Sequence, residues 1–598
     1  MKKELLGIFV FMLLISAPVL TVSGRLNGES ISEIQKDFIV RKERSNDEAE
    51  PLGNGNIVEK VFILGAPVKG ANGLKIGPDG NLYIASGLGR EIVVMDPKNG
   101  KVLKRLGSDQ GVMGPDDLVF GPDGSLYWTD IVNGEVGRLK PDGTYSKQYV
   151  APMVNPIAFN DEGRLFVAQA FVGDGLYEVD PDFIDDPNKI LGVGNLALQM
   201  NGFEFGPDGL LYAPYPYLDE IVSVDVDTAE VNVVASGVDG GPRAVAFDSN
   251  DEMYVAIKAG IIHCDINTGI CTHVADIEES LDNLAFDTED CLYISNTEHG
   301  TIYKLKKNEK IKIVSPGGLI APQGITTLDI DGDETIFIAD WWTQKGFDSN
   351  SGKQKICGSS INPMTVSSDG ENLILSSWYT NLVAVWDPET QTILESYNFN
   401  LPSNAIRFHE DLVVTEVGTA SVIMKDHTTG SLTTLASGIY VPTGIACQCD
   451  DGDLWVADYV TGIVYQIIDD GVVLDTKKIV ASGLSYPEGL AVDHDGSLLV
   501  VESGLKQLTR IDPETGDKTV IVDNLAIGGP APPGWMPYWL FNDVCVGENG
   551  YIYVTGDIEN VVYRIQVLPP FSGFPFLNWL FERFPNLFPI LKQLIGFS

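Results

Sequence analysis

Cysteine and histidine are scarce in this 598-residue sequence, which contains seven Cys and six His. An odd and small number of cysteines excludes a disulfide framework as the basis of the fold. Cys264 and Cys271 flank a short turn and are the pair best placed to form a single bond. No nucleophile elbow, phosphate-binding loop or zinc motif is present either. Any chemistry therefore has to be inferred from where a fold would bring its polar residues together.

Basic residues are also few. The 40 Lys and Arg are outnumbered by 83 Asp and Glu, which gives a formal net charge of −43 and a pI near 4.3. This charge excludes a nucleic-acid backbone as a partner and argues against an anionic lipid surface, whereas cations suit it. A generally acidic surface that keeps the protein soluble explains most of the excess equally well.

The two ends of the chain differ from the rest. Residues 5–20 form an apolar run that is short for a membrane span, follows two lysines and precedes small residues, so 1–24 is predicted to be a secretory signal, with an uncleaved anchor as the alternative. A secreted or cell-surface location follows. Polar residues 25–56 are predicted to be a linker. The tail, 568–598, is rich in Phe, Leu and Pro and is either docked on the protein or a membrane-surface or partner-binding element.

One phrase recurs along nearly all of the remaining chain. GPDGSLYWTD at 121–130 consists of a Pro-Asp-Gly turn and an alternating strand that ends on a carboxylate, and it follows another apolar strand. Drifted copies stand at 77–86, 206–215, 332–340, 451–458 and 494–502. This alternation, with turns rich in Gly, Asn and Asp, leaves little room for helix and predicts an all-β fold.

The copies recur at intervals of 39 to 54 residues. Twelve positions align just before the first strand of each copy: Asn72, Asp116, Asn155, Asn201, Arg243, Asp282, Gln323, Asn362, Asn404, Thr443, Glu488 and Asn542. A period near 40 with four short strands per unit is typical of propeller blades, and twelve blades exceed the usual number in one ring. The sequence therefore predicts two tandem six-bladed β-propellers built from twelve four-stranded blades.

Closure of each ring requires an outer strand from elsewhere in the chain. We expect the first propeller to span 57–305 and to be closed by strand 57–64, and the second to span 311–567 and to be closed by strand 311–315. The boundary between them is predicted near 306–310.

Strand direction should bring the twelve aligned residues to one mouth of each central channel. Converging oxygen-bearing side chains suit a hard divalent cation, Ca²⁺ first and Mg²⁺ as the alternative, and the absence of His and Cys among them disfavours zinc. The alternative interpretation is that these residues satisfy turn amides or one another. Arg243 would compete with a cation in the first ring.

Aromatic residues favour the second propeller as the one that carries a ligand site. Those predicted to reach its mouth and bind ligand are Trp341, Trp342, Trp378, Tyr379, Tyr459, Trp535 and Trp539. The longest interval contains the loop 526–540, which is long enough to act as a lid. Flat rings beside carboxylates suit a sugar, a lactone or an aromatic ring, although the same rings would also serve to pack loops or bury an interface.

The repeat and these aligned residues resemble the family of regucalcin (senescence marker protein) and gluconolactonase, over about 57–566, with NHL repeats as the bare scaffold and paraoxonases more distant. The resemblance implies a metal held by a Glu and by Asn or Asp residues on later blades, above which a lactone is hydrolysed. By this resemblance the metal ligands are Glu488, Gln323, Asn362, Asn404 and Asn542 in the second ring, and Asp282, Asp116, Asn155 and Asn201 in the first. Both rings depart from the family in having Asn at the last position, where it typically has or neighbours a carboxylate base.

Two classes of function follow. In a metal-dependent lactone or ester hydrolase, Glu488 or the strand-end acids Asp458 and Glu502 would activate water. A non-catalytic extracellular propeller would instead bind a small molecule or a protein. The phrase GPDG-x-L-[YW] also resembles virginiamycin B lyase, but that resemblance implies a catalytic His at the mouth, and His299 is the one histidine near a predicted mouth loop.

Overall fold

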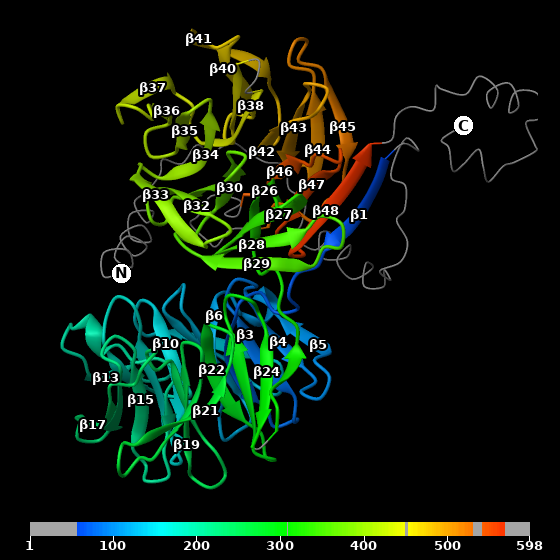
Figure 1. Ribbon diagram of the computed structural model, residues 1–598. Coiled ribbons are helices and arrows are strands. Elements are labelled where there is room, and N and C mark those ends of the chain that lie inside the picture. The colour runs from blue at the N-terminus through cyan, green and yellow to red at the C-terminus, as the bar shows by residue number, and fades with distance from the viewer. Residues whose placement is uncertain (1–56, 308, 449–451, 530–540, 568–598) are drawn as a thin grey trace, which may run out of the picture. The chain divides into compact units, whose positions relative to one another are not determined.

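The structure is a computed structural model that describes residues 57–307, 309–448, 452–529 and 541–567, and they form the predicted all-β fold (Figure 1). Forty-eight strands make twelve antiparallel four-stranded sheets. Within these ranges there are two short 3₁₀ helices, η1 (Ser108–Gln110) and η2 (Leu196–Leu198), and no α-helix. No helix in them is long and apolar enough to cross a membrane. The predicted signal, linker and C-terminal tail lie outside the described residues.

The first propeller is a compact unit of residues 64–321. Its six blades are β2 (Ala71–Ile76), β3 (Leu82–Ser86), β4 (Glu91–Met95), β5 (Val102–Leu106); β6 (Pro115–Phe120), β7 (Leu126–Asp130), β8 (Glu135–Leu139), β9 (Tyr145–Tyr149); β10 (Val154–Phe159), β11 (Leu165–Gln169), β12 (Leu176–Val179), β13 (Asn188–Leu191); β14 (Glu204–Phe205), β15 (Leu211–Tyr215), β16 (Glu220–Asp225), β17 (Glu230–Ser236); β18 (Ala244–Phe247), β19 (Met253–Ile257), β20 (Gly260–Cys264), β21 (Cys271–Asp276); and β22 (Leu281–Phe286), β23 (Cys291–Asn296), β24 (Ile302–Lys306), β25 (Lys312–Ser315). The innermost strand of each blade contacts that of the next, and β22 contacts β2, so the ring is closed.

The second propeller combines residues 57–63 with 322–567. Its six blades are β26 (Pro322–Ile330), β27 (Asp333–Asp340), β28 (Thr343–Asp348), β29 (Gln354–Ser359); β30 (Thr365–Ser368), β31 (Leu373–Ser377), β32 (Leu382–Asp387), β33 (Thr392–Asn398); β34 (Pro402–Phe408), β35 (Asp411–Glu416), β36 (Ser421–Lys425), β37 (Leu432–Ser437); β38 (Pro442–Gln448), β39 (Asp453–Asp458), β40 (Ile463–Asp469), β41 (Val472–Ala481); β42 (Pro487–Val492), β43 (Leu498–Glu502), β44 (Gln507–Ile511), β45 (Lys518–Val522); and β46 (Val544–Val546), β47 (Ile552–Gly556), β48 (Val561–Val567), β1 (Ile57–Ile63). Innermost strands contact in order here too, and β46 contacts β26.

The two closing strands are exchanged relative to the prediction from the sequence. Strand β1 pairs with β48 and completes the second propeller, as Figure 1 shows, whereas β25 pairs with β24 and completes the first. A hairpin between β24 and β25 closes only a short loop, whereas pairing β25 with β48 would close a loop of about 245 residues, which costs more chain entropy. The predicted boundary near 306–310 is therefore wrong. The first propeller is an insertion between β1 and β26 of the second.

The recurring Pro-Asp-Gly turn has a specific packing role. In the copy at 121–125, the Gly121 amide donates to Ser125 O at 2.9 Å, and Asp123 Oδ1 accepts the Ser125 amide at 2.9 Å. A Cβ on Gly121 would lie 2.9 Å from Cε2 of Tyr127, so the ring of the following strand needs a glycine there. Equivalent tyrosines pack edge-to-face on the next blade in the pairs Tyr83–Phe120, Tyr127–Phe159 and Tyr212–Phe247.

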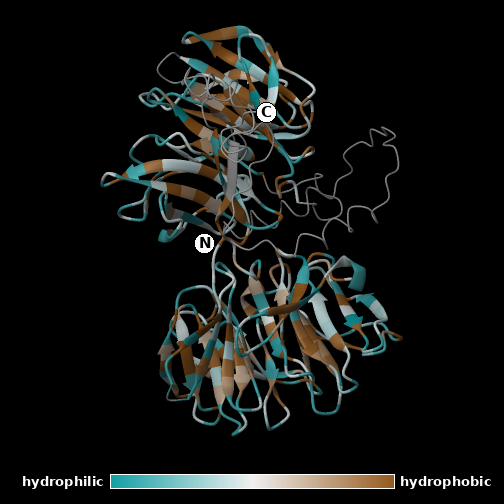
Figure 2. Ribbon diagram, turned by 90° about the vertical axis from the view of Figure 1, so that its right-hand side faces the viewer, coloured by the Kyte–Doolittle hydropathy of each residue, from teal (hydrophilic) through white to brown (hydrophobic). Residues whose placement is uncertain are grey.

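Most apolar residues lie in the strands, and most residues of the connecting turns are polar (Figure 2). The hydrophobic clusters along the strands each join two neighbouring blades. Leu82 and Ile84 of the first blade, for example, share a cluster with Tyr293 and Ile302 of the sixth. The cores therefore lie between blades and hold each ring closed. Cys264 and Cys271 form a disulfide across the β20–β21 hairpin.

Candidate functional site at the mouth of the second propeller

The register of the innermost strands sets which residues reach the channel. In four blades of the second propeller the first residue of the inner strand pairs with the acid that ends the next strand, and three of these pairs are Pro322 with Asp340, Pro442 with Asp458, and Pro487 with Glu502. The residue that follows each proline is buried: Gln323, Thr443 and Glu488. Thr443 and Glu488, with Asn542 and Asn404, border one narrow cavity that leaves room for about one water molecule or ion.

Two predicted positions are displaced in the structure. Val366 pairs with Leu375, which places Met364 at the position predicted for Asn362. Asn362 precedes β30 by three residues and has a left-handed backbone, φ 56°. In β34, Pro402 pairs with Glu416, so Ser403 takes the position predicted for Asn404. The prediction is wrong at these two positions because it takes Met364 and Ile406 as the first apolar residues of the strands, whereas the strand pairing puts Val366 and Ala405 at that place.

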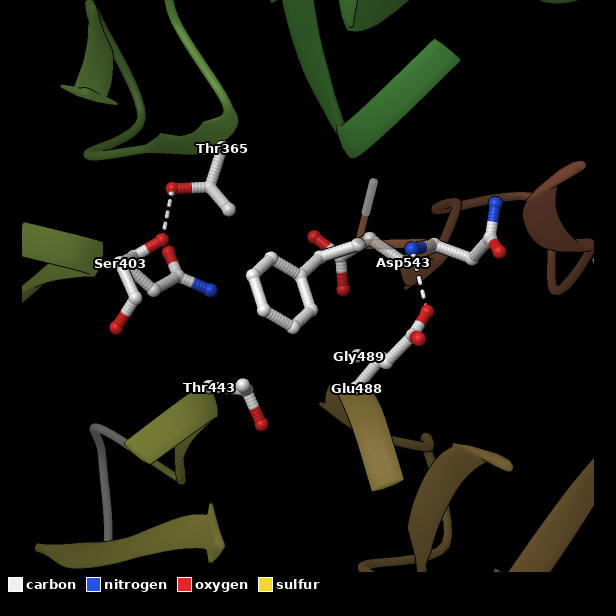
Figure 3. A pocket seen from close by; sticks show the side chains of 9 residues that line it. Thr365, Ser403, Thr443, Glu488, Gly489 and Asp543 are labelled. Carbon is white, nitrogen blue, oxygen red and sulfur yellow. Dashed lines mark hydrogen bonds between the residues drawn. The ribbon is translucent and has the colours of Figure 1, made fainter. Parts of the chain in front are cut away.

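Glu488 is the buried acid of this cavity. It is 1% exposed, and its Oε2 accepts the Asn542 amide at 2.7 Å (Figure 3). Burial raises the pKa of Glu488 well above its usual value, and the charges of Asp557 and Asp543 add to this, while the Ser503 hydroxyl and the Asn542 amide oppose it. Its other oxygen, Oε1, is buried and accepts no hydrogen bond of normal geometry within the described residues.

Asp543 also borders the cavity and was not singled out from the sequence. Its two oxygens accept the amides of Val544 at 2.9 Å and Ile325 at 3.3 Å, and its own amide donates to Thr555 Oγ1 at 2.9 Å. A Cβ on Gly489 of the neighbouring blade would lie 2.4 Å from Asp543 Oδ1. Burial raises the pKa of Asp543 to about 7 against these two amide donors.

The first propeller repeats this arrangement at Asp117. Asp117 accepts the amides of Leu118 at 2.8 Å and Ile157 at 3.2 Å, its amide donates to Thr129 at 2.9 Å, and a Cβ on Gly73 would lie 2.2 Å from Oδ1. Because the same contacts occur in both rings, we interpret Asp543 and Asp117 as braces between blades. An Asp at this place, where the other blades have uncharged residues, most often Gly, is the signal in the sequence that would have found them.

We expect the metal-free protein to lose stability as the pH rises. Folding raises the pKa of Asp543 from 3.8 to about 7, so between these values the unfolded chain releases a proton that the folded chain keeps. The contribution of Asp543 to the free energy of unfolding is therefore fully present below pH 3.8 and is lost as the pH rises through about 7. The loss from this group is ~4 kcal/mol. Melting of chelator-treated wild type and Asp543→Asn at pH 5 and pH 8 tests this. Equal pH dependence of the two proteins would contradict it.

The strand-end acids predicted to be catalytic, Asp458 and Glu502, hold loops. Asp458 is fully buried and accepts the amides of Tyr440 at 3.1 Å and Val441 at 3.2 Å. Glu502 accepts the Ser485 amide at 2.8 Å, the Gln507 side-chain amide at 2.8 Å and the Thr509 hydroxyl at 2.5 Å. Neither borders the cavity around Glu488. The fully buried Asp340 is likewise engaged, by Lys345 at 2.6 Å.

The predicted aromatic residues gather but are packed against one another. Trp378, Tyr379 and Tyr459 form a buried cluster with Met364 and Phe541, and Phe541 also borders the cavity. Trp341 lies 5.2 Å from the Tyr379 ring and 5.7 Å from that of Trp342, and both tryptophans are partly buried. Trp535, Trp539 and most of the predicted lid lie outside the described residues. Of the described members of this cluster, Phe541 alone borders the cavity.

The aligned residues of the first ring form a polar network. Asn72 donates to Asp116 at 2.8 Å, and Asn155 donates to Asn201 at 3.2 Å. Burial raises the pKa of Asp282 to about 6 and that of Asp116 well above its usual value, and each shift is increased by neighbouring carboxylates. Arg243 is exposed; its charge lowers the pKa of Asp282, but none of the ion pairs found in the described ranges involves it.

A cation site of several acids is not present among the described residues, since no group of three or more His, Cys, Asp or Glu could hold a metal ion. The predicted ligands of the second ring supply one carboxylate and neutral amides. Gln323 is fully buried, and neither its amide oxygen nor its nitrogen is hydrogen-bonded to a described residue. Asn542 Oδ1 accepts the Gly528 amide, and Asn404 Oδ1 accepts the Ala405 amide. Glu488 and Gln323 therefore offer the free oxygens.

The sequence matches no protein-family model, and comparison with curated proteins gives no match. Similar solved structures include virginiamycin B lyase from Staphylococcus aureus, at 15% identity and a TM-score of 0.36 over 48% of this chain and 96% of that one. Another is the extracellular domain of BT3049 from B. thetaiotaomicron, at 12% identity and a TM-score of 0.31 over 87% of this chain and 83% of that one. At these values the similarities carry no inference about function.

Proposed function

We propose that the second propeller hydrolyses a small lactone or ester at the mouth of its channel, and that Glu488 moves the proton. The observation that supports this is a buried carboxyl at a cavity, with one oxygen free of described partners and a pKa raised by burial. A carboxyl with a raised pKa is a better base near neutral pH and can return the proton to the leaving oxygen. Figure 3 shows Glu488 across the cavity from Ser403 and Thr443. Their hydroxyl groups donate to the carbonyls of Pro442 and Pro487, and their oxygens would accept a hydrogen bond from the water molecule that attacks the substrate.

A divalent cation, Ca²⁺ or Mg²⁺, would bind in the same channel through Glu488, which borders the cavity, and Gln323, which does not border it but has an amide oxygen without a described partner. A bound cation would polarise the substrate carbonyl. One carboxylate and neutral amides make a weak ligand set, so we expect weak binding. Of the other predicted ligands, Asn362 is displaced from the ring, and the oxygens of Asn404 and Asn542 already accept backbone amides.

Removal of divalent cations should lower the hydrolysis of a panel of lactones and aryl esters by tenfold or more, and added Ca²⁺ should restore it, because the cation would share the developing negative charge. The measurement is initial rate before and after treatment with a chelator, with magnesium as the second ion. Full activity in chelator would remove the cation from the proposal while leaving the role of Glu488 open to its own test.

A second candidate function is non-catalytic binding of a small molecule or an extracellular protein. It is favoured by the engagement of Asp458 and Glu502 in loop contacts, which leaves Glu488 without a second free acid. Ligand binding without turnover across the same panel would select this function. A lyase that depends on a mouth histidine is less well supported: His299 belongs to the first propeller and is 8% exposed, with a Cβ on Gly317 3.1 Å from its own Cβ.

Export of the protein through its predicted signal is part of the same proposal, and the apolar run at residues 5–20 supports it. Contact of the C-terminal tail with a membrane surface belongs to the same proposal. The mass of the mature N-terminus and the protein's distribution between medium and membrane would test both.

A further inference from the structure

The first propeller has a lysine-lined groove where its first and last blades meet. The groove has a volume of about 330 Å³ and is bordered by Pro97, Lys98, Asn99, Lys304, Lys312, Ile313 and Val314. Lys98 and Asn99 come from the β4–β5 turn, and the other two lysines from β24 and β25. The blades are tightly packed here, because a Cβ on Gly100 would lie 1.9 Å from Val314 O. The groove is therefore a fixed feature of ring closure.

Two of the lysines oppose each other directly. Lys304 and Lys312 are Cα partners in the β24–β25 pair, and like charges at directly opposed positions destabilise a sheet. Lys304 donates to Tyr293 at 2.5 Å and lies 3.6 Å from Asp287. Lys312 pairs with Glu309 at 2.7 Å, but both side chains are about half exposed or more, at 67% and 46%, so that pair is weak.

Lys98 adds a third cation with no carboxylate partner among the ion pairs of the described residues. The segment 304–312 contains five lysines and one glutamate, in a chain whose net charge is −43. A cluster of charges of one sign along a groove concentrates ions of the opposite sign. The acidic remainder of the surface repels a long polyanion, so a small anion fits this groove better than a polymer does.

We propose that this groove binds a small molecule that carries two or more phosphate, sulfate or carboxylate groups. The anionic groups would lie between Lys98, Lys304 and Lys312, and Ile313 and Val314 would contact the body of the ligand. The negative charge of such a ligand would offset the repulsion between Lys304 and Lys312, so the opposed pair would not destabilise the sheet when the ligand is bound. The site is separate from the channel and does not depend on the proposed hydrolysis.

Calorimetric titration of full-length protein with inorganic pyrophosphate at low ionic strength tests the proposal. We expect one binding site, with an affinity that falls as salt is added. The double variant Lys98→Gln/Lys312→Gln should bind at least tenfold more weakly. Without anion it should melt at the same temperature as wild type or higher, because a like-charge pair has been removed. Citrate titrated in parallel shows whether phosphate or carboxylate is preferred.

Lys140→Gln is the matched control, since Lys140 is an exposed lysine in a turn of another blade of the same propeller. It should bind pyrophosphate as wild type does. Absence of binding to wild type, wild-type affinity in the double variant, or equal weakening by Lys140→Gln would each overturn the proposal. If the double variant melts lower without anion, the single variant Lys98→Gln, which lies in an exposed turn, gives the decisive affinity.

Discussion

Replacing Glu488 with Gln should lower kcat/KM for the hydrolysed lactone or ester by about 10²–10⁴. The substitution keeps the shape of the side chain and removes its ability to release and take up a proton. It should not lower the melting temperature, because burial already favours the neutral form of this carboxyl. At pH 8, where the wild-type acid carries more charge, the variant should melt at the same temperature or higher. Steady-state rates and thermal melting of both proteins measure these two effects.

Glu416→Gln is the matched control for that experiment. Glu416 is also a buried acid of the second propeller, 6% exposed, and it accepts the Asn400 amide at 2.8 Å and the Thr419 hydroxyl at 2.6 Å. Its substitution should lower the melting temperature and leave the rate per folded molecule unchanged. Retained hydrolysis in Glu488→Gln, or equal losses in the two variants, would show that Glu488 is a structural acid and would favour the non-catalytic function.

Removal of β1 should unfold the second propeller and spare the first. Strand β1 supplies the fourth strand of the blade formed by β46, β47 and β48, and Ile63 is 2% exposed there. Burial of that side chain contributes roughly 2 kcal/mol, and each hydrogen bond of the ladder ~1 kcal/mol. The loss is therefore comparable with the total stability of an ordinary domain, about 5–15 kcal/mol.

The experiment compares proteins that begin at residue 57 and at residue 64. The longer protein should show the melting of both propellers, and the shorter one should retain only that of the first. Residues 64–321 expressed alone provide the control and should fold, since β25 closes that ring within the fragment. Equal melting of the proteins that begin at residue 57 and at residue 64 would mean that β1 does not close the second ring. A fragment 64–321 that fails to fold would contradict the division into two units.

The architecture of each blade could be predicted from local sequence. Three local features determine the hairpin of each copy: the Pro-Asp-Gly turn, the alternation of the strands and the tyrosine that packs on the turn glycine. All act within about ten residues, so the hairpin can be predicted from each copy separately. The period then gave the number of blades. It also identified Glu488, Thr443 and Asn542 as neighbours at one channel, because equivalent positions in a ring converge.

Tertiary structure decided the features that depend on partners distant in the chain. By sequence alone, β1 and β25 could each complete either of the two three-stranded blades. The short connection between β24 and β25 favours their pairing, and β1 then pairs with β48. The start of each inner strand is set by pairing with the next strand, which put Met364 and Ser403 where the sequence predicted Asn362 and Asn404.

The chemistry of the acids was decided in the same way. Asp458, Glu502 and Glu488 are alike in sequence, each an acid at or next to a strand end. Only in the folded protein do loop amides and side chains occupy Asp458 and Glu502, while Glu488 is left at a cavity with one oxygen free of described partners. A residue's type and spacing are fixed by the sequence, but its hydrogen-bond partners, its burial and hence its pKa depend on segments that only the closed ring brings together.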